Sequence, residues 1–154
     1  MQVSEVLRIK GSTLFTVTPE TMLSEGVVVM ADNDIGSLVV MDQGRLVGML
    51  TFREVIKVLA QRQREHRAGP TPPVSGIHIR DVMKSDPLVA SPQTEVNELR
   101  RQMLESHQRY LPVMDDGTLL GVISFHDVAR AVLEEQGFEN KMLKAYIQDW
   151  PAAG

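Results

Sequence analysis

The sequence predicts an α/β fold, of the α+β kind, made of two pseudo-symmetric halves that each run β-α-β-β-α. Two observations lead to this prediction. The segment "IGSLVVMDQGRLVGMLTFREV", residues 35–55, recurs without a gap as "QRYLPVMDDGTLLGVISFHDV", residues 108–128. The same offset of 73 residues also aligns Pro19 with Pro92, which indicates an internal duplication. Within each copy, runs of apolar residues typical of strands alternate with apolar residues at helical spacing.

Each half is expected to begin with a short extended stretch that ends at a proline, "LFTVTP" at 14–19 and "PLVASP" at 87–92. A helix should follow in both halves, although Gly26 weakens the first one. The apolar residues at helical spacing are Leu23, Val27 and Met30 in the first half and Val96, Leu99 and Met103 in the second.

Two apolar strands joined by a glycine-containing hairpin come next in each half, "SLVVMD-QG-RLVGML" and "YLPVMD-DG-TLLGVI". The segments "FREVIKVLA" and "FHDVARAVL" then start the closing helices. We expect the repeats to cover 7–60 and 77–136. A linker rich in proline and glycine at 61–76, whose charged front extends the preceding helix, should separate them. A short last helix in the tail 137–154 should dock its apolar residues, Phe138, Leu143, Tyr146 and Trp150.

Composition limits the classes of function. The net charge of −4 argues against nucleic acid or an anionic membrane as partner. The absence of cysteine, of a signal-like N-terminus and of a long apolar run favours a soluble cytoplasmic protein. We expect no enzyme, because the usual catalytic motifs are absent. No metal is expected either, because the four histidines are widely separated.

The octapeptides "GMLTFREV" (48–55) and "GVISFHDV" (121–128) allow two interpretations. In each, a hydroxyl residue at the strand–helix join precedes an acid by three positions, which is the pattern of a capping box. Alternatively, the hydroxyl and the free N–H groups of the helix start suit a phosphate, and the acid suits a ribose diol. Together these groups would describe a nucleotide pocket.

The duplicated order of elements, the segment "LPVMDDGTLLGVIS" and the ending G-h-h-[ST]-x-x-D (h, apolar) resemble tandem CBS domains, the Bateman module, over residues of about 7 to 136. The resemblance implies two pockets in a cleft, each taking its hydroxyl and acid from one repeat and its loop residues from the other. The first pocket would use Gly11, Ser12, Thr13, Ile35, Gly36, Ser37, Ser124, His126 and Asp127. Asp127 would bind the ribose hydroxyls, and Ser124 and His126 would face the phosphate.

The second pocket implied by the resemblance would use Thr51, Arg53, Glu54, Ser85, Asp86, Pro87, Arg109 and Tyr110. It departs from the family pattern, because Glu54 replaces the usual aspartate and its extra methylene pushes the carboxylate into the ribose position. Arg53 and Arg109 would still attract phosphate. Tyr110 either stacks on a base or covers the core at a strand start. His126 is a milder departure in the first pocket.

The resemblance therefore implies a non-catalytic regulatory module, similar to small bacterial proteins with a stand-alone CBS pair. It would bind an adenosine nucleotide (AMP, ADP or ATP, or else NAD(H) or S-adenosylmethionine) and signal to a target protein that the sequence does not identify. The alternative is a structural or dimerisation module without a ligand. We also expect a homodimer through helices 55–60 and 128–133. The first carries Val55, Ile56, Val58 and Leu59, an apolar stripe too wide for one buried face.

Overall fold

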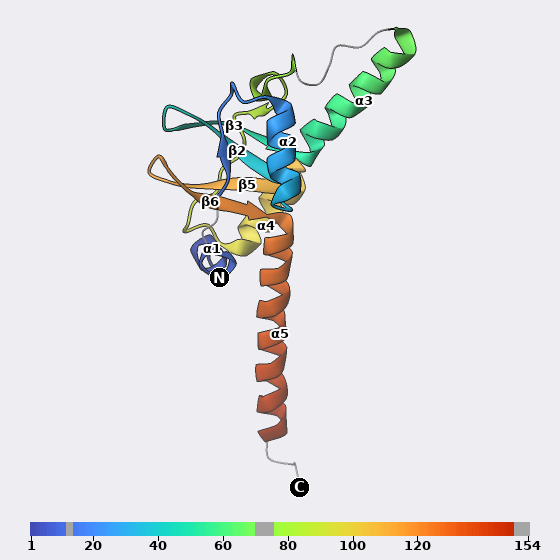
Figure 1. The fold of residues 1–154 in the computed structure, drawn as a ribbon. Helices are drawn as coiled ribbons and strands as arrows, with labels where there is room; N and C mark the ends of the chain where they lie inside the picture. Colours follow the sequence, from blue (N-terminus) through green and yellow to red (C-terminus); the bar gives the residue numbers. More distant parts are fainter. Residues whose placement is uncertain (12–13, 70–75, 150–154) are drawn as a thin grey trace.

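The structure is a computed structural model that describes residues 1–11, 14–69 and 76–149, without the side chains of 67–68 and 147–149. It confirms the predicted mixture of helices and strands and the division into two similar halves (Figure 1). The first half holds α1 (Val3–Lys10), β1 (Thr16–Val17), α2 (Leu23–Asp32), β2 (Ser37–Asp42), β3 (Arg45–Thr51) and α3 (Phe52–Ala68). The second holds η2 (Ile79–Asp81), β4 (Lys84–Ser85), α4 (Val96–Ser106), β5 (Tyr110–Asp115), β6 (Thr118–Ser124) and α5 (Phe125–Asp149).

The two β-hairpins are built alike. β2 pairs with β3, and β5 pairs with β6, both antiparallel, and each pair shifts register after its fourth strand residue, Val40 or Val113. The tips turn through two residues of positive φ, Gln43 at 49° and Gly44 at 77° in the first hairpin. Asp116 and Gly117 repeat this in the second hairpin. Two consecutive positive φ angles define the type I′ turn, which matches the right-handed twist of the strands.

The first strand is longer in the first half than in the second. β1 pairs in parallel with β2 through Thr16 and Val17, whereas the second half keeps one bridge, Ala90 to Val113. In the first half the amide of Val39 donates to the carbonyl of Phe15 at 3.4 Å. Pro112 stands 73 residues after Val39 and has no N–H to donate, so the parallel pairing is shortened there.

The segments at the start of the two halves are exchanged. Val3 and Val6 of α1 lie in the core of the second half, with Leu99, Leu111 and Ile123 among its buried members. Ile79 of η2 lies in the core of the first half, and β4 adds to the edge of its sheet by pairing with β3. Each repeat therefore completes the other.

Two glycines at equivalent places in the octapeptides allow this exchange. A Cβ on Gly121 would lie 3.2 Å from the Leu7 side chain of α1. A Cβ on Gly48 would lie 2.7 Å from Sδ of Met83 and 2.9 Å from the carbonyl oxygen of Lys84. A side chain at position 48 would collide with backbone, whereas a methyl group at position 121 would require the Leu7 side chain to shift.

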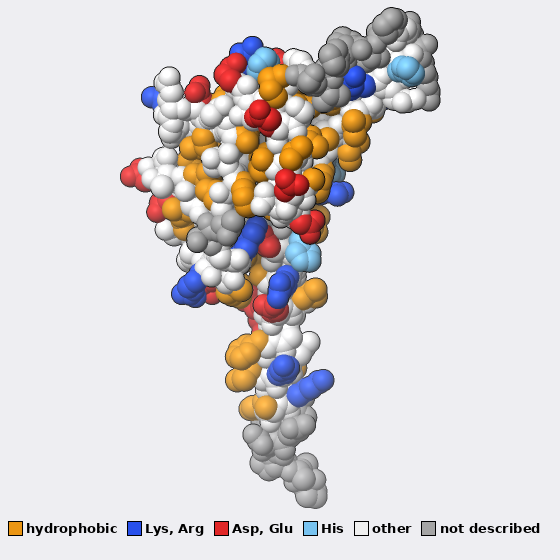
Figure 2. Space-filling view, in the orientation of Figure 1, with side chains coloured by type: hydrophobic (Ala, Val, Ile, Leu, Met, Phe, Trp, Pro, Cys, Tyr) orange, Lys and Arg blue, Asp and Glu red, His pale blue; other side chains and the backbone are white. Residues whose placement is uncertain are grey.

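The prediction of a separate, docked tail helix was wrong. α5 runs without a break to Asp149 and extends away from the rest of the chain (Figure 1). Phe138, Leu143 and Tyr146 are 64%, 57% and 60% exposed, and apolar side chains are visible along this helix in Figure 2. One glycine, Gly137, costs only about 1 kcal/mol and does not end a helix whose neighbours favour helix. Trp150 lies outside the described residues.

The segment predicted as a linker begins as helix, since α3 continues to Ala68, in line with its charged front extending the preceding helix. Residues 70–75 of that segment lie outside the described part of the chain. Among the helices of the described ranges, none is both long and apolar enough to cross a membrane.

Candidate functional site

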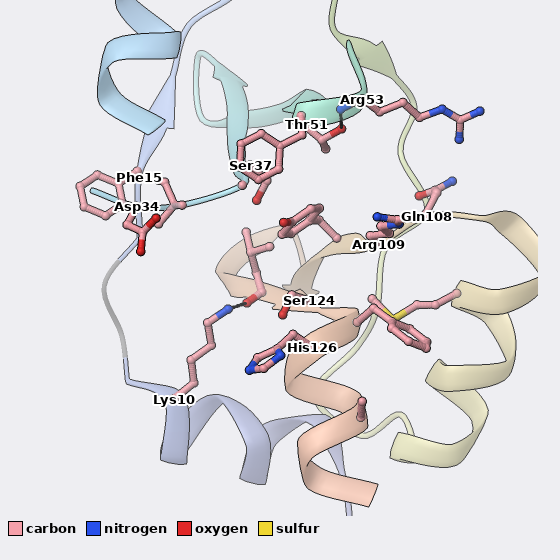
Figure 3. A pocket seen from close by; sticks show the side chains of 18 of the residues that line it. Lys10, Phe15, Asp34, Ser37, Thr51, Arg53, Gln108, Arg109, Ser124 and His126 are labelled. Carbon is pink, nitrogen blue, oxygen red and sulfur yellow. Dashed lines mark hydrogen bonds between the residues drawn. The ribbon is translucent and has the colours of Figure 1, made fainter. Parts of the chain in front are cut away.

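A cavity of about 1600 Å³ lies between the two repeats, with walls from both (Figure 3). The first repeat contributes the end of α1, the residues before β2 and the start of α3. The second contributes the end of α4, the start of β5, the end of β6 and the start of α5. The strand–helix joins of both octapeptides, at Thr51 and Ser124, therefore face one continuous cleft.

The cleft is positively charged although the chain carries a net charge of −4. Four lysine or arginine residues line it, namely Lys10, Arg53, Lys57 and Arg109. Among the residues that line it, Asp34 is the only acid. A concave wall of one charge sign concentrates counter-ions, so the cleft favours an anionic ligand.

Ser124 and Asp127 form a reciprocal cap at the start of α5. The backbone N–H of Asp127 donates to Oγ of Ser124 at 3.0 Å, and the N–H of Ser124 donates to Oδ2 of Asp127 at 2.9 Å. Lys10 approaches from α1, and its Nζ donates to the same Oδ2 at 2.7 Å and to the carbonyl oxygen of Val122 at 2.8 Å. Oδ1 of Asp127 accepts no hydrogen bond from any described residue.

Asp127 is held ionised. Partial burial alone would raise the pKa of its carboxyl group, but the opposing interactions are stronger together. The hydrogen bond and charge of Lys10 and the hydrogen bonds with Ser124 bring the pKa below its usual value. An ionised carboxylate with a free oxygen can accept hydroxyl hydrogens from a diol.

The first octapeptide uses its acid differently. Glu54 receives the backbone N–H of Thr51 on Oε1 at 3.2 Å and the Thr51 hydroxyl on Oε2 at 2.9 Å. The hydroxyl oxygen of Thr51 accepts the N–H of Arg53 at 3.2 Å. Both carboxylate oxygens of Glu54 are thus engaged in the capping box of α3.

Tyr110 crosses from the second repeat to the backbone of the first. A Cβ on Gly36 would overlap the Tyr110 hydroxyl and lie 2.7 Å from the Phe52 ring. Burial raises the pKa of the Tyr110 hydroxyl, the positive charge of Arg109 lowers it, and the negative charge of Asp127 raises it further. Tyr110 lines the cleft and packs against the first repeat at Gly36.

The structure brings together most of the residues predicted for the first pocket. Six of them line the cleft: Gly11, Ile35, Gly36, Ser37, Ser124 and His126. Asp127 lies directly behind this wall, bonded to Lys10 and Ser124. Ser12 and Thr13 lie outside the described residues.

The second pocket is assembled only in part. Thr51, Arg53, Arg109 and Tyr110 line the cleft, whereas Glu54, Ser85, Asp86 and Pro87 are not among the lining residues. Ser85 belongs to β4 and pairs with Gly48 at the sheet edge. Lys84 and Ser85 thus form an edge strand of the first repeat's sheet.

Sequence reasoning missed several residues of the cleft. Lys10 is the most important, because it is bonded to Asp127. The sequence pointed to Lys10 only through its position next to Gly11, a predicted pocket residue. Its contact with Asp127 could not be predicted, because it depends on how α1 packs. Phe15, Asp34 and Gln108 also line the cleft. Among the described residues no group of three or more His, Cys, Asp or Glu side chains is arranged to hold a metal.

Comparison with known proteins relates this geometry to a family. The model of the CBS domain matches residues 3–61 and again residues 79–134. A 17.7 kDa protein of Acidianus ambivalens is 31% identical over 133 residues, which cover 85% of this chain and 74% of that protein.

Two solved structures resemble the chain along most of its length. A CBS-domain-containing protein from Agrobacterium tumefaciens has a TM-score of 0.74 and 26% identity, over 85% of this chain and 98% of the other. The structure of CBSX2 from Arabidopsis thaliana in complex with AMP has a TM-score of 0.69 and 26% identity, over 88% and 98%.

Proposed function

This chain belongs to the CBS-domain family, of which it carries two copies, and we propose that it is a non-catalytic regulatory module that binds an adenosine nucleotide between them. The observation that carries the proposal is the carboxylate of Asp127. It is ionised, it keeps one oxygen without a hydrogen-bond donor from the described residues, and it adjoins a cleft lined by cations. A related CBS-pair protein, CBSX2, has been solved with AMP.

In the proposed complex Asp127 accepts the ribose hydroxyls. Ser124 and the first N–H groups of α5 face the phosphate, where a helix start favours negative charge. His126 and Lys10 line the same part of the cleft, and Lys10 supplies positive charge near the phosphate. The apolar wall near Ile35 and Phe15 would receive the base.

Regulation requires that ligand binding change something that a partner protein detects. We propose that the signal passes through the relative position of the two repeats, because the cleft has walls from both and each repeat holds a segment of the other. A nucleotide in the cleft would favour one arrangement by its differential affinity for it.

We also propose that two modules form a homodimer through α3 and the start of α5. Ile56 and Leu59 on α3 and Leu133 on α5 are 61%, 58% and 67% exposed on this chain, and exposed apolar side chains that gather in a patch mark interaction surfaces. Pairing with a second copy would remove these side chains from water.

The nucleotide proposal is tested by calorimetric titration with AMP, ATP and NADH of the wild type, Asp127→Ala and Glu54→Ala. Asp127→Ala should weaken binding about ten- to a hundredfold, since a hydrogen bond to a charged group contributes roughly 1.5–3 kcal/mol. Glu54→Ala loses a similar helix cap but should bind nearly as well as the wild type. Thermal melting without ligand measures how much each change destabilises the fold.

Equal, wild-type binding by both variants would show that Asp127 is only a helix cap. No binding by the wild type to any of these nucleotides, together with no thermal stabilisation by S-adenosylmethionine, would favour the alternative of a structural module without a ligand. Mass spectrometry of small molecules that co-purify with the protein would name the ligand directly.

A further inference from the structure

The two ends of the cleft are unequal in their capacity to hold a nucleoside. At the Ser124 end, Asp127 keeps a free oxygen and is flanked by Lys10. At the Thr51 end, both oxygens of Glu54 are bonded to Thr51. The residue equivalent to Lys10 in the duplication is Met83, whose sulfur packs over Gly48, so this end has no equivalent of the Lys10–Asp127 pair.

The Thr51 end nevertheless carries strong positive charge. Arg53 begins α3 and Arg109 precedes β5, and both side chains line the cleft. Lys57 follows Arg53 by one helical turn on the same wall. None of the three makes an ion pair with another described residue, in contrast to Lys10, Arg80, Arg101 and Arg130.

Polar side chains lie on two opposite sides of the cleft. Figure 3 shows Arg53, Arg109 and Gln108 on one side and Lys10 and His126 on the other, beside Ser124. Residues from both sides line one continuous cavity of about 1600 Å³.

From this arrangement we infer that the cleft binds one nucleotide with a polyphosphate chain, its ribose at Asp127 and its chain reaching across the cleft to Arg53 and Arg109. The inference rests on the proposed function. It adds the ligand class, the number of ligands per chain and a role for two residues of the end that does not hold a nucleoside.

The chemistry of the side chains supports this division of roles. Guanidinium groups bind phosphate oxygens through paired, charge-assisted hydrogen bonds. Unpaired arginines facing a cleft provide such bonds without first losing a carboxylate partner. A monophosphate held at Ser124 leaves them unused, whereas a longer chain reaches them and joins the two repeats through one molecule.

The test is calorimetric titration of the wild type, Arg53→Ala, Arg109→Ala and Arg45→Ala with AMP and with ATP at one ionic strength. Arg45 is a matched control, because it is an exposed arginine at the β2–β3 hairpin outside the cleft. The wild type should bind one ATP per chain, more tightly than AMP. Arg53→Ala and Arg109→Ala should each weaken ATP binding about tenfold and AMP binding less than about twofold, and Arg45→Ala should change neither.

The variant Asp127→Ala distinguishes a failure of this inference from a failure of the proposed function. If it weakens binding of AMP and ATP about ten- to a hundredfold while the arginine variants affect both nucleotides equally or neither, the proposed function holds and the bridging chain is wrong. Two ATP molecules per chain would likewise overturn the bridging ligand. If the wild type binds neither nucleotide, the proposed function fails and this inference fails with it.

Discussion

Lys10 and Asp127 are separated by 117 residues of sequence, and their side chains meet at 2.7 Å. The contact joins the last residue of α1 to the first turn of α5. It places a cation beside the carboxylate that we propose as the ribose anchor. The exchanged first segment of the chain therefore contributes to the candidate site as well as to the core of the second repeat.

Lys10→Met should lower the free energy of unfolding at neutral pH, by about 0.5–1 kcal/mol because the pair is partly open to water. Methionine is the residue at the equivalent position of the duplication, Met83. Since the pKa of Asp127 is depressed in the folded state, its contribution is present above its unfolded pKa, about 3.9, and is lost as pH falls through its folded value.

Urea unfolding of both proteins across pH 7 to pH 2.5 checks this prediction. The difference in stability should be full at pH 7 and should narrow below about pH 4. Lys57→Met is the control, because Lys57 makes no ion pair with a described residue and should change stability little at either pH. If the loss of unfolding free energy caused by Lys10→Met stays constant down to the lowest pH, the ion pair is not the source of that loss.

Gly36→Ala should destabilise the protein by about 1–3 kcal/mol, the usual cost of an overpacked contact. The new methyl group would overlap the Tyr110 hydroxyl and meet the Phe52 ring at 2.7 Å. The double variant Gly36→Ala/Tyr110→Ala should lose less stability than the sum of the losses of the two single variants, because removing the ring makes room for the methyl group.

Gly137→Ala is the matched control for that experiment. It lies within α5 with nothing within 4 Å of the added Cβ, so it should stabilise the protein by about 0.5–1 kcal/mol. Strict additivity of Gly36→Ala and Tyr110→Ala in thermal or urea unfolding would contradict the close contact between Tyr110 and the first repeat.

Leu59→Glu and Leu133→Glu should shift the proposed homodimer towards monomer, because each would bury a charge in the contact between two modules. Light scattering at micromolar concentration measures the shift. Leu120→Glu on β6 is the control, since this leucine is also partly exposed, at 42%, but lies outside α3 and α5. A wild type that is monomeric at this concentration would contradict the proposal, and so would a dimer that neither change affects.

Much of the local structure was predictable because it depends on residues close together in the sequence. The hairpin tips at Gln43–Gly44 and Asp116–Gly117 take positive φ as their composition requires. The pattern of Thr51 followed by Glu54 predicts the capping box that α3 has. The tail was mispredicted because apolar spacing shows that Phe138 and Leu143 can share a helix face without showing whether this chain covers it.

The duplication, the positions of the hairpin turns, and the hydroxyl and acid that begin each closing helix can all be read from the amino-acid sequence. Those features follow from backbone preferences and hydrogen bonds over a few residues. The folded structure was needed to show that Lys10 lies against Asp127, that Met83 packs over Gly48 at the other end, and that Tyr110 reaches the backbone at Gly36. Such contacts depend on how the exchanged segments pack. The periodicity of side chains shows which face of an element is buried but not which residues cover it, so these contacts could not be predicted from the sequence.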